Sequence, residues 1–338
     1  MVFTLVLAGA VLVPPSLKLA AATPTPKRFQ IQAQSRTVSV PYLSNVDLDV
    51  GSEAITRAII PIHGLGSDPN GIYNRVRNAA QKIPGMTEKA LILAPQMLER
   101  GEISGTIDED LVYWWWNPYW GSERVLVGPS EVSENLSSFT VLDQMIDHLL
   151  KASLFPNLED IVIIGFSAGG QLVHRYAVSS PKETQARATR DIHFRYVVMS
   201  PSSYVYLDNK RAISGTTDTF AIFDGAGCGS FNSYGYGLNN LYSYHSENGM
   251  TPALMRQQYE KRFVFYLTGE ADNNPNDSGL DKRCQALLEG AHRLERAVIF
   301  FNYVQDLYGP SILDRQNLQT VPGIGHSDAL IESAQGMK

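Results

Sequence analysis

Short runs of apolar and β-branched residues recur along the chain, and each is followed by turn residues and often by a segment with helical periodicity. Continuous apolar runs of this length are typical of strands that are buried on both faces. The runs predicted as strands are 58–62, 90–94, 161–164, 196–199, 263–267 and 318–321. Because strands that alternate with helices are joined by right-handed crossovers, we expect a mostly parallel central sheet with helices on both faces.

Two helices and a hairpin complete this pattern. Residues 138–150 and 171–178 have helical periodicity, and Ser137 or Ser138 is a natural N-cap for the first helix. Residues 29–40 alternate between apolar and polar positions, which predicts a hairpin of edge strands. The expected fold class is therefore α/β.

Two long segments break the alternation of strands and helices. Residues 96–136 and 201–257 lie between predicted strands and are rich in Gly, Tyr, Trp, Ser and Asn. Long excursions in a compact domain are typical of lids and binding loops, and the alternative is irregular surface structure. We treat residues 23–338 as a single α/β domain that carries both excursions, because α/β enzymes of this length often form one domain.

The first 22 residues are predicted to lie outside the fold. Residues 2–13 are apolar, two prolines follow, and Ala20-Ala21-Ala22 offers the small residues that a signal peptidase requires. This apolar run is too short for a transmembrane helix, which needs roughly 20 residues. We expect a signal peptide over 1–22 and a secreted, extracellular protein without stable membrane insertion; the alternative is an uncleaved amino-terminal anchor.

Charge and cysteine content add a few constraints. The chain has 338 residues, a formal net charge of −6 and no long run of Lys or Arg, so nucleic acid is not an expected partner. Cys228 and Cys284 would form one disulfide in an oxidising compartment and stay buried thiols in the cytosol. Asn135 and Asn276 begin Asn-X-Ser triplets, so both are candidates for glycosylation.

The first indication of chemistry is Gly165-Phe166-Ser167-Ala168-Gly169, between the predicted strand 161–164 and the predicted helix. A serine on such a strand-to-helix turn has a strained backbone that lifts its hydroxyl above the sheet. The residues two before and two after it must be small, and both are glycine. We therefore predict that Ser167 is a nucleophile; the alternative is a glycine-rich turn with an idle serine.

A serine nucleophile needs a histidine that accepts its proton and a carboxylate that orients the histidine. Among seven histidines, His326 is the predicted base because it lies in a glycine-rich turn after the last predicted strand. His174 lies about two helical turns beyond Ser167, roughly 10 Å away, so we expect it to pack within the fold.

The predicted acid lies in the turn after strand 263–267. Glu270 and Asp272 both follow the carboxyl end of this strand, where open α/β sheets place their chemistry. Asp272 is preferred because its two extra residues let it turn over the sheet edge, and Glu270 and Asp224 are the alternatives. The chain order nucleophile, acid, histidine differs from the orders that other serine hydrolase folds use.

Two backbone amides are expected to stabilise the negative charge that develops on the substrate oxygen. One belongs to Ala168, directly after the nucleophile, and the other to Gly64 or Leu65 in the loop after strand 58–62. His63 is expected to position this loop and not to act as a base; the alternative is a loop histidine of no consequence.

With these motifs assembled, the chain resembles the α/β-hydrolase superfamily from about residue 55 to 332. The resemblance rests on the His-Gly loop, the nucleophile turn, the Gly-Glu-Ala-Asp turn and the late Gly-His. Segments 228–238 and 281–296 are similar to secreted microbial serine esterases that are grouped with polyhydroxyalkanoate depolymerases. This similarity favours a Cys228–Cys284 disulfide and a small or polymeric ester substrate. The sequence departs from lipases because it lacks a long apolar lid helix.

All four tryptophans lie in one aromatic segment, residues 113–120. Six large aromatic side chains in eight residues cannot all face one core, so some should line a substrate cleft. The predicted substrate-binding residues are Trp114, Trp115, Trp116 and Trp120. Tyrosines of the second excursion are candidates for the facing wall: Tyr234, Tyr236, Tyr242 and Tyr244. The alternative is that the aromatic segment packs against the body of the protein.

No metal and no cofactor are expected, because the sequence has no His-Glu-x-x-His motif, no zinc-ligand spacing and no phosphate-binding loop. The expected activity is hydrolysis of a carboxylic ester through an acyl-enzyme. Acyltransferase or peptidase activity with the same residues is the alternative, and a non-catalytic binding module is a third hypothesis from a different class. A serine at the nucleophile position argues against epoxide and haloalkane hydrolysis, which use a carboxylate there.

Overall fold

The computed structural model describes residues 22–114 and 124–337, so predicted signal-peptide residues 1–21 lie outside the described part of the chain. Ala22 was expected to leave with the signal peptide. Instead, it is buried and forms a parallel bridge with Ile103. No helix among the described residues is long and apolar enough to cross a membrane.

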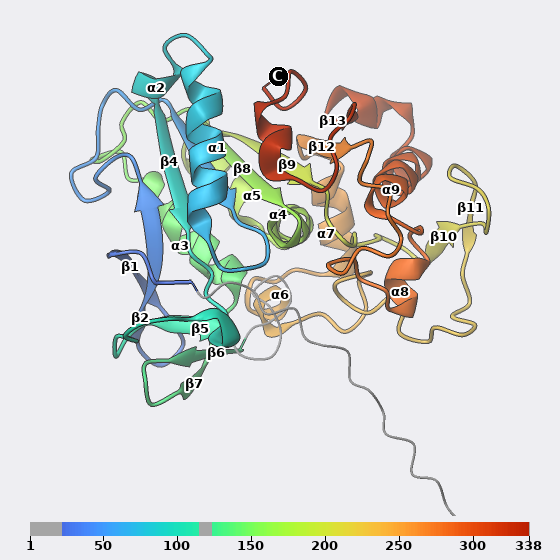
Figure 1. Ribbon diagram of the computed structural model, residues 1–338, viewed down its shortest axis with the longest axis horizontal. Helices are drawn as coiled ribbons and strands as arrows, with labels where there is room; N and C mark the ends of the chain where they lie inside the picture. Colours follow the sequence, from blue (N-terminus) through green and yellow to red (C-terminus); the bar gives the residue numbers. More distant parts are fainter. Residues whose placement is uncertain (1–21, 115–123, 338) are drawn as a thin grey trace, which may run out of the picture.

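An eight-stranded sheet forms the centre of the molecule, in the order β1-β2-β4-β3-β8-β9-β12-β13 (Figure 1). The strands are β1 (Lys27–Gln32), β2 (Thr37–Ser44), β3 (Arg57–Ile62), β4 (Ala90–Pro95), β8 (Asp160–Phe166), β9 (His193–Met199), β12 (Val264–Gly269) and β13 (Gln316–Val321). In this spatial order, every neighbouring pair from β4–β3 to β12–β13 is parallel. β1 and β2 form an antiparallel hairpin at one edge of the sheet. The α/β class, the mostly parallel sheet and the edge hairpin are confirmed.

Helices cover both faces of this sheet. One face packs against α1 (Pro69–Gln81) and the short η3 (Asp328–Glu332). The other face packs against α3 (Ser138–Leu149), α4 (Ala168–Ser179), α7 (Pro252–Tyr259) and α9 (Arg293–Tyr308). Successive strand residues alternate between these layers: Ile60 belongs to the α3–α4–α9 side, and Ile59 packs on the α1 side. This two-sided burial explains why the strands are continuously apolar.

The predicted start of α3 agrees with the structure, whereas the predicted start of α4 is three residues late. Ser137 is the N-cap of α3, and its side chain accepts a hydrogen bond from the Phe139 amide. The predicted helix at Gln171 begins three residues earlier, at Ala168, because the nucleophile turn leads directly into α4. The shorter helices are α2 (Met86–Lys89), α5 (Lys182–Thr189), α6 (Ser243–Glu247), α8 (Cys284–Leu287), η1 (Arg100–Glu102) and η2 (Pro310–Asp314).

Both long excursions contain ordered secondary structure. The first forms a small antiparallel sheet of β5 (Val112–Trp114), β6 (Arg124–Val127) and β7 (Val132–Asn135). The second includes the hairpin β10 (Lys210–Ala212) and β11 (Phe220–Ile222), followed by α6 and α7. Of the two glycosylation candidates, Asn276 is exposed, whereas Asn135 is half-buried and its Nδ2 lies 3.4 Å from Ser243 Oγ.

Candidate active site

The turn between β8 and α4 holds Ser167 in a strained conformation, with φ of 56° and ψ of −114°. Residues other than glycine rarely adopt a positive φ, and such strain clusters at functional sites. A Cβ on Gly165 would lie 2.2 Å from the Gly169 carbonyl oxygen, and one on Gly169 would lie 2.2 Å from the Ile62 carbonyl oxygen. Only glycine fits at either position: Gly165 allows the end of β8 to pack against the start of α4, and Gly169 allows the turn to approach the end of β3.

His326 lies between Ser167 and Asp272. Its Nε2 is 2.9 Å from Ser167 Oγ, and its Nδ1 is 2.8 Å from Asp272 Oδ2. The three residues follow β8, β12 and β13, whose carboxyl ends meet at one edge of the sheet because these strands are parallel. An Nδ1–H that donates to the carboxylate leaves Nε2 free to accept the serine proton.

The other candidate acids lie away from His326. Glu270 is exposed, and its Oε1 accepts a hydrogen bond of 2.9 Å from Thr320 Oγ1. Asp224 is exposed in the loop after β11, where it accepts a hydrogen bond from the Ala226 amide. The structure therefore brings Asp272, and neither alternative, to the histidine.

His174 packs in the core, as expected. Its ring lies edge-on to the rings of Tyr204, Tyr259 and Phe300, with centroids 4.8–5.7 Å apart. Its Nδ1 accepts a hydrogen bond of 3.3 Å from the Val205 amide. Burial lowers the pKa of His174 to about 3, so this histidine stays neutral and takes no part in the site.

Asp272 has a second partner that the sequence did not suggest. The Nη1 of Arg293 lies 3.4 Å from Asp272 Oδ1, and Nη2 of the same side chain donates to Asp277 Oδ1 at 2.9 Å. Arg293 is the first residue of α9 and is fully buried. No local sequence signal identifies it, because its role depends on how α9 packs beneath the turn after β12.

The predicted oxyanion-hole residues surround the nucleophile. Ala168 is the first residue of α4, so its amide is at the positive end of the helix dipole. A Cβ on Gly64 would lie 3.5 Å from Ser167 Cβ, which places that backbone directly against the serine. Leu65 lines the same cleft as Ser167 and Ala168.

His63 is buried beneath this loop in a defined tautomer. Its Nε2 accepts a hydrogen bond of 3.0 Å from the Met97 amide, so the proton is on Nδ1, which lies 2.7 Å from the Gly64 carbonyl oxygen. Burial lowers the pKa of His63 to about 4 and keeps the ring neutral. His63 therefore anchors the carbonyl of Gly64.

A cleft of about 310 Å³ opens beside Ser167. Its lining includes Leu65, Ala168 and Gln171, together with the continuous segment 278–283, which we call the 278–283 wall. Ser202 also lines the cleft, and its hydroxyl donates to the Gly279 carbonyl at 3.0 Å. Sequence reasoning missed Gln171, although its position one helical turn after Ser167 was a usable signal.

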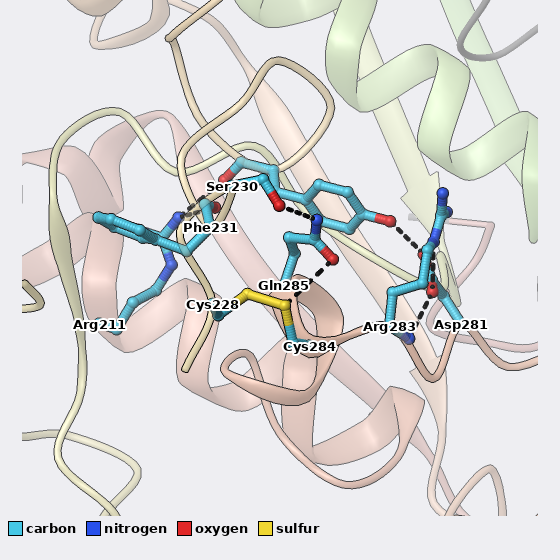
Figure 2. The surroundings of a disulfide bond; sticks show 9 residues. Arg211, Cys228, Ser230, Phe231, Asp281, Arg283, Cys284 and Gln285 are labelled. Carbon is cyan, nitrogen blue, oxygen red and sulfur yellow. Dashed lines mark hydrogen bonds and ion pairs between the residues drawn. A yellow bond between two sulfur atoms is a disulfide. The ribbon is translucent and has the colours of Figure 1, made fainter. Parts of the chain in front are cut away.

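The Cys228–Cys284 disulfide is formed and lies at the end of the 278–283 wall (Figure 2). Gln285 Nε2 donates to Ser230 Oγ at 2.7 Å, which joins the same two segments a second time. Within the wall, both carboxylate oxygens of Asp281 accept hydrogen bonds from Arg283, at 3.0 and 2.6 Å. The wall is thus tied to the second excursion at its carboxyl end.

Trp114 is the only predicted substrate-binding tryptophan among the described residues. Trp114 is fully buried in the main core and is not a residue of the described cleft lining. Trp115, Trp116 and Trp120 lie outside the described residues. The tyrosines of the second excursion are packed as well: the Tyr244 hydroxyl donates to Asp143, and the Tyr236 hydroxyl donates to Asp281. None of the four predicted tyrosines is among the described residues that line the cleft beside Ser167.

Within residues 22–114 and 124–337, no group of three or more His, Cys, Asp or Glu side chains is arranged to hold a metal ion.

Solved structures similar to this chain were found by comparison. Poly(aspartic acid) hydrolase-1 from Sphingomonas sp. KT-1 superposes with a TM-score of 0.54 and 21% identity, over 94% of this chain and 96% of that chain. LpqC, a poly(3-hydroxybutyrate) depolymerase from Bordetella parapertussis, superposes with a TM-score of 0.55 and 19% identity, over 90% and 86% of the two chains. No protein-family model and no curated protein sequence matches the chain. The structural similarities confirm the fold that the sequence predicted.

Proposed function

We propose that this chain, which has the α/β-hydrolase fold, is a serine hydrolase that cleaves carboxylic esters through an acyl-enzyme. The observation that carries the proposal is the continuous hydrogen-bonded series from Ser167 Oγ through His326 to Asp272, with distances of 2.9 and 2.8 Å. Ser167, where the series begins, lines a cleft and has a strained backbone. These features together are those of an activated nucleophile.

The first half of the reaction forms the acyl-enzyme. His326 Nε2 accepts the hydroxyl proton as Ser167 Oγ attacks the ester carbonyl carbon, and Asp272 stabilises the imidazolium that results. The tetrahedral intermediate then collapses, and His326 returns the proton to the leaving alcohol. In the second half, His326 takes a proton from water, the hydroxide attacks the acyl-enzyme, and Ser167 regains its proton as the acid leaves.

We assign the second oxyanion donor to the Leu65 amide. His63 holds the Gly64 carbonyl, and the carbonyl and amide of a trans peptide point in opposite directions. The Leu65 N–H therefore points away from His63, and Leu65 lines the cleft beside Ser167. Together with the Ala168 amide at the start of α4, it supplies the two donors that a developing oxyanion needs.

A fluorophosphonate probe tests the nucleophile. The folded protein should become labelled on Ser167, and Ser167→Ala should remove both the label and ester hydrolysis. Absence of labelling in folded wild-type protein would contradict catalysis by this serine. Addition of an alcohol acceptor separates the alternatives, because an acyltransferase would divert the acyl group from water, whereas an esterase would continue to release the free acid.

We also propose that the protein is secreted after removal of the amino-terminal apolar segment. The disulfide supports an oxidising compartment. Because Ala22 is paired with Ile103, cleavage should leave Ala22 in the mature protein. Mass spectrometry of the mature chain measures this directly, and a first residue beyond Ala22 would contradict the assignment.

A further inference from the structure

We infer that the acyl group of the substrate carries a carboxylate, which Lys282 and the side-chain amide of Gln171 recognise in the cleft beside Ser167. The inference rests on the proposed ester hydrolysis and names the substrate class that the site selects.

The position of the cleft identifies it as the acyl site. Its lining includes Leu65 and Ala168, which carry the assigned oxyanion donors, and Ser167 itself. His326, which must contact the leaving oxygen, is not among the described residues that line it. In the tetrahedral intermediate the leaving group is next to the histidine, so the cleft on the oxyanion side receives the acyl chain.

Gln171 presents a fixed hydrogen-bond donor to this cleft. Its Oε1 accepts a hydrogen bond of 2.8 Å from Ser203 Oγ, which in turn accepts one of 3.1 Å from Arg175 Nη2. This series sets the orientation of the amide, so Nε2 is directed away from Ser203. Gln171 is only 5% exposed, and Nε2 has no acceptor within the part of the chain that the structure describes. This Nε2 is not fully buried, and a ligand that displaces water from it in the cleft must supply an acceptor or leave the donor unpaired.

Lys282 supplies the unbalanced charge of the cleft. It is exposed in the 278–283 wall and forms no ion pair with any described residue. Its neighbour Arg283 is already neutralised by Asp281 and lies over the Tyr236 ring, 5.4 Å from the centroid. The described lining therefore has one excess positive charge, although the whole chain has a formal net charge of −6.

The other carboxylates near the site do not cancel this charge. Asp272 is paired with His326 and Arg293, and Asp277 is paired with Arg293. A cation and an oriented amide donor in the lining of one cleft match the two oxygens of a carboxylate. An apolar acyl chain would cover the Gln171 donor without giving it a partner, and a cationic one would meet Lys282.

Two esters of equal size test the inference. The monoanionic p-nitrophenyl ester of adipic acid is compared with p-nitrophenyl 6-methylheptanoate, whose branched end has the shape of the carboxylate without its charge. The ratio of kcat/KM for the two esters should fall about five- to tenfold in Lys282→Gln, the range expected for one charge-assisted contact in a partly exposed site. Added salt should lower the ratio in the wild type and have much less effect in this variant.

Gln171→Met should lower the same ratio, because it removes the donor and keeps the volume. Lys261→Gln is the matched control: it deletes an exposed lysine after α7, away from the cleft, and should leave the ratio unchanged. A ratio that Lys282→Gln does not change would overturn the inference while leaving ester hydrolysis intact. Failure of the wild type to hydrolyse either ester would contradict the proposed function instead.

Discussion

The guanidinium of Arg293 lies 3.4 Å from Asp272 Oδ1, the carboxylate oxygen that does not contact His326. The backbone reinforces this contact, because the Leu294 amide donates to the Asp272 carbonyl at 3.1 Å. The start of α9 thus holds the proposed acid by both its side chain and its main chain. Arg293 acts as a positioning residue, since it reaches the reaction only through Asp272.

Arg293→Met should lower both stability and turnover. It leaves Asp272 without its buried counter-charge, and loss of one partner of a buried pair costs about 3 kcal/mol of unfolding free energy. At a temperature where the variant remains folded, kcat should fall while KM changes little, because the acid no longer fixes the histidine. Arg293→Lys should recover part of kcat, whereas a purely structural role predicts an unchanged kcat in every folded variant.

Asp272→Asn should reduce kcat by roughly a thousandfold or more, because a neutral amide does not stabilise the imidazolium or its tautomer. Glu270→Gln, two residues earlier, should change kcat by less than about twofold, because Glu270 is exposed and bonded to Thr320. Steady-state kinetics on one p-nitrophenyl ester compares the two variants. A larger loss in Glu270→Gln would move the acid to that residue.

Gly165→Ala should destabilise the protein by more than about 3 kcal/mol, because the new methyl group collides with backbone that cannot move aside. The matched control is Gly101→Ala, where a Cβ meets no atom within 4 Å and should change stability by less than about 0.5 kcal/mol. Urea denaturation monitored by tryptophan fluorescence measures both. Equal stability of the two variants would show that the close packing of the nucleophile turn is dispensable.

His174 should make the folded state less stable as the pH falls below neutral. Its pKa is about 3 in the folded protein and about 6.5 in the unfolded chain, so between these values only the unfolded chain binds the proton. Below pH 6.5 the wild type should therefore lose about 1.4 kcal/mol per pH unit relative to His174→Leu. Denaturation of both proteins at pH 5, 6 and 7 tests this, and a pH-independent difference would contradict it.

Reduction of the Cys228–Cys284 disulfide should lower the free energy of unfolding by about 4 kcal/mol, because the bond closes a loop with a sequence separation of 56. It should also raise KM more than it lowers kcat, since the disulfide anchors the 278–283 wall and neither cysteine contacts Ser167, His326 or Asp272 through any hydrogen bond. Cys228→Ser/Cys284→Ser should behave like the reduced protein. A change in kcat alone would place the effect at the nucleophile instead.

Local sequence patterns were sufficient for the sheet and the nucleophile. The apolar runs identified the parallel strands because each strand is buried on both faces, and the alternating segment identified the hairpin of β1 and β2. The turn at Ser167 could also be recognised from the sequence, because the two glycines that it requires, Gly165 and Gly169, lie within two residues of the serine. These features depend on short-range geometry, which neighbouring residues encode.

The packing of distant segments decided the rest of the site. Glu270 and Asp272 follow the same strand, and only the position of β13 and α9 brings Asp272 to His326. Trp114 became a core residue because β5 lies against the main sheet, and residues 278–283 became the cleft wall because a disulfide joins them to the second excursion. Long-range contacts of this kind depend on where helices and loops pack after the sheet has formed, and no local pattern of residues specifies them.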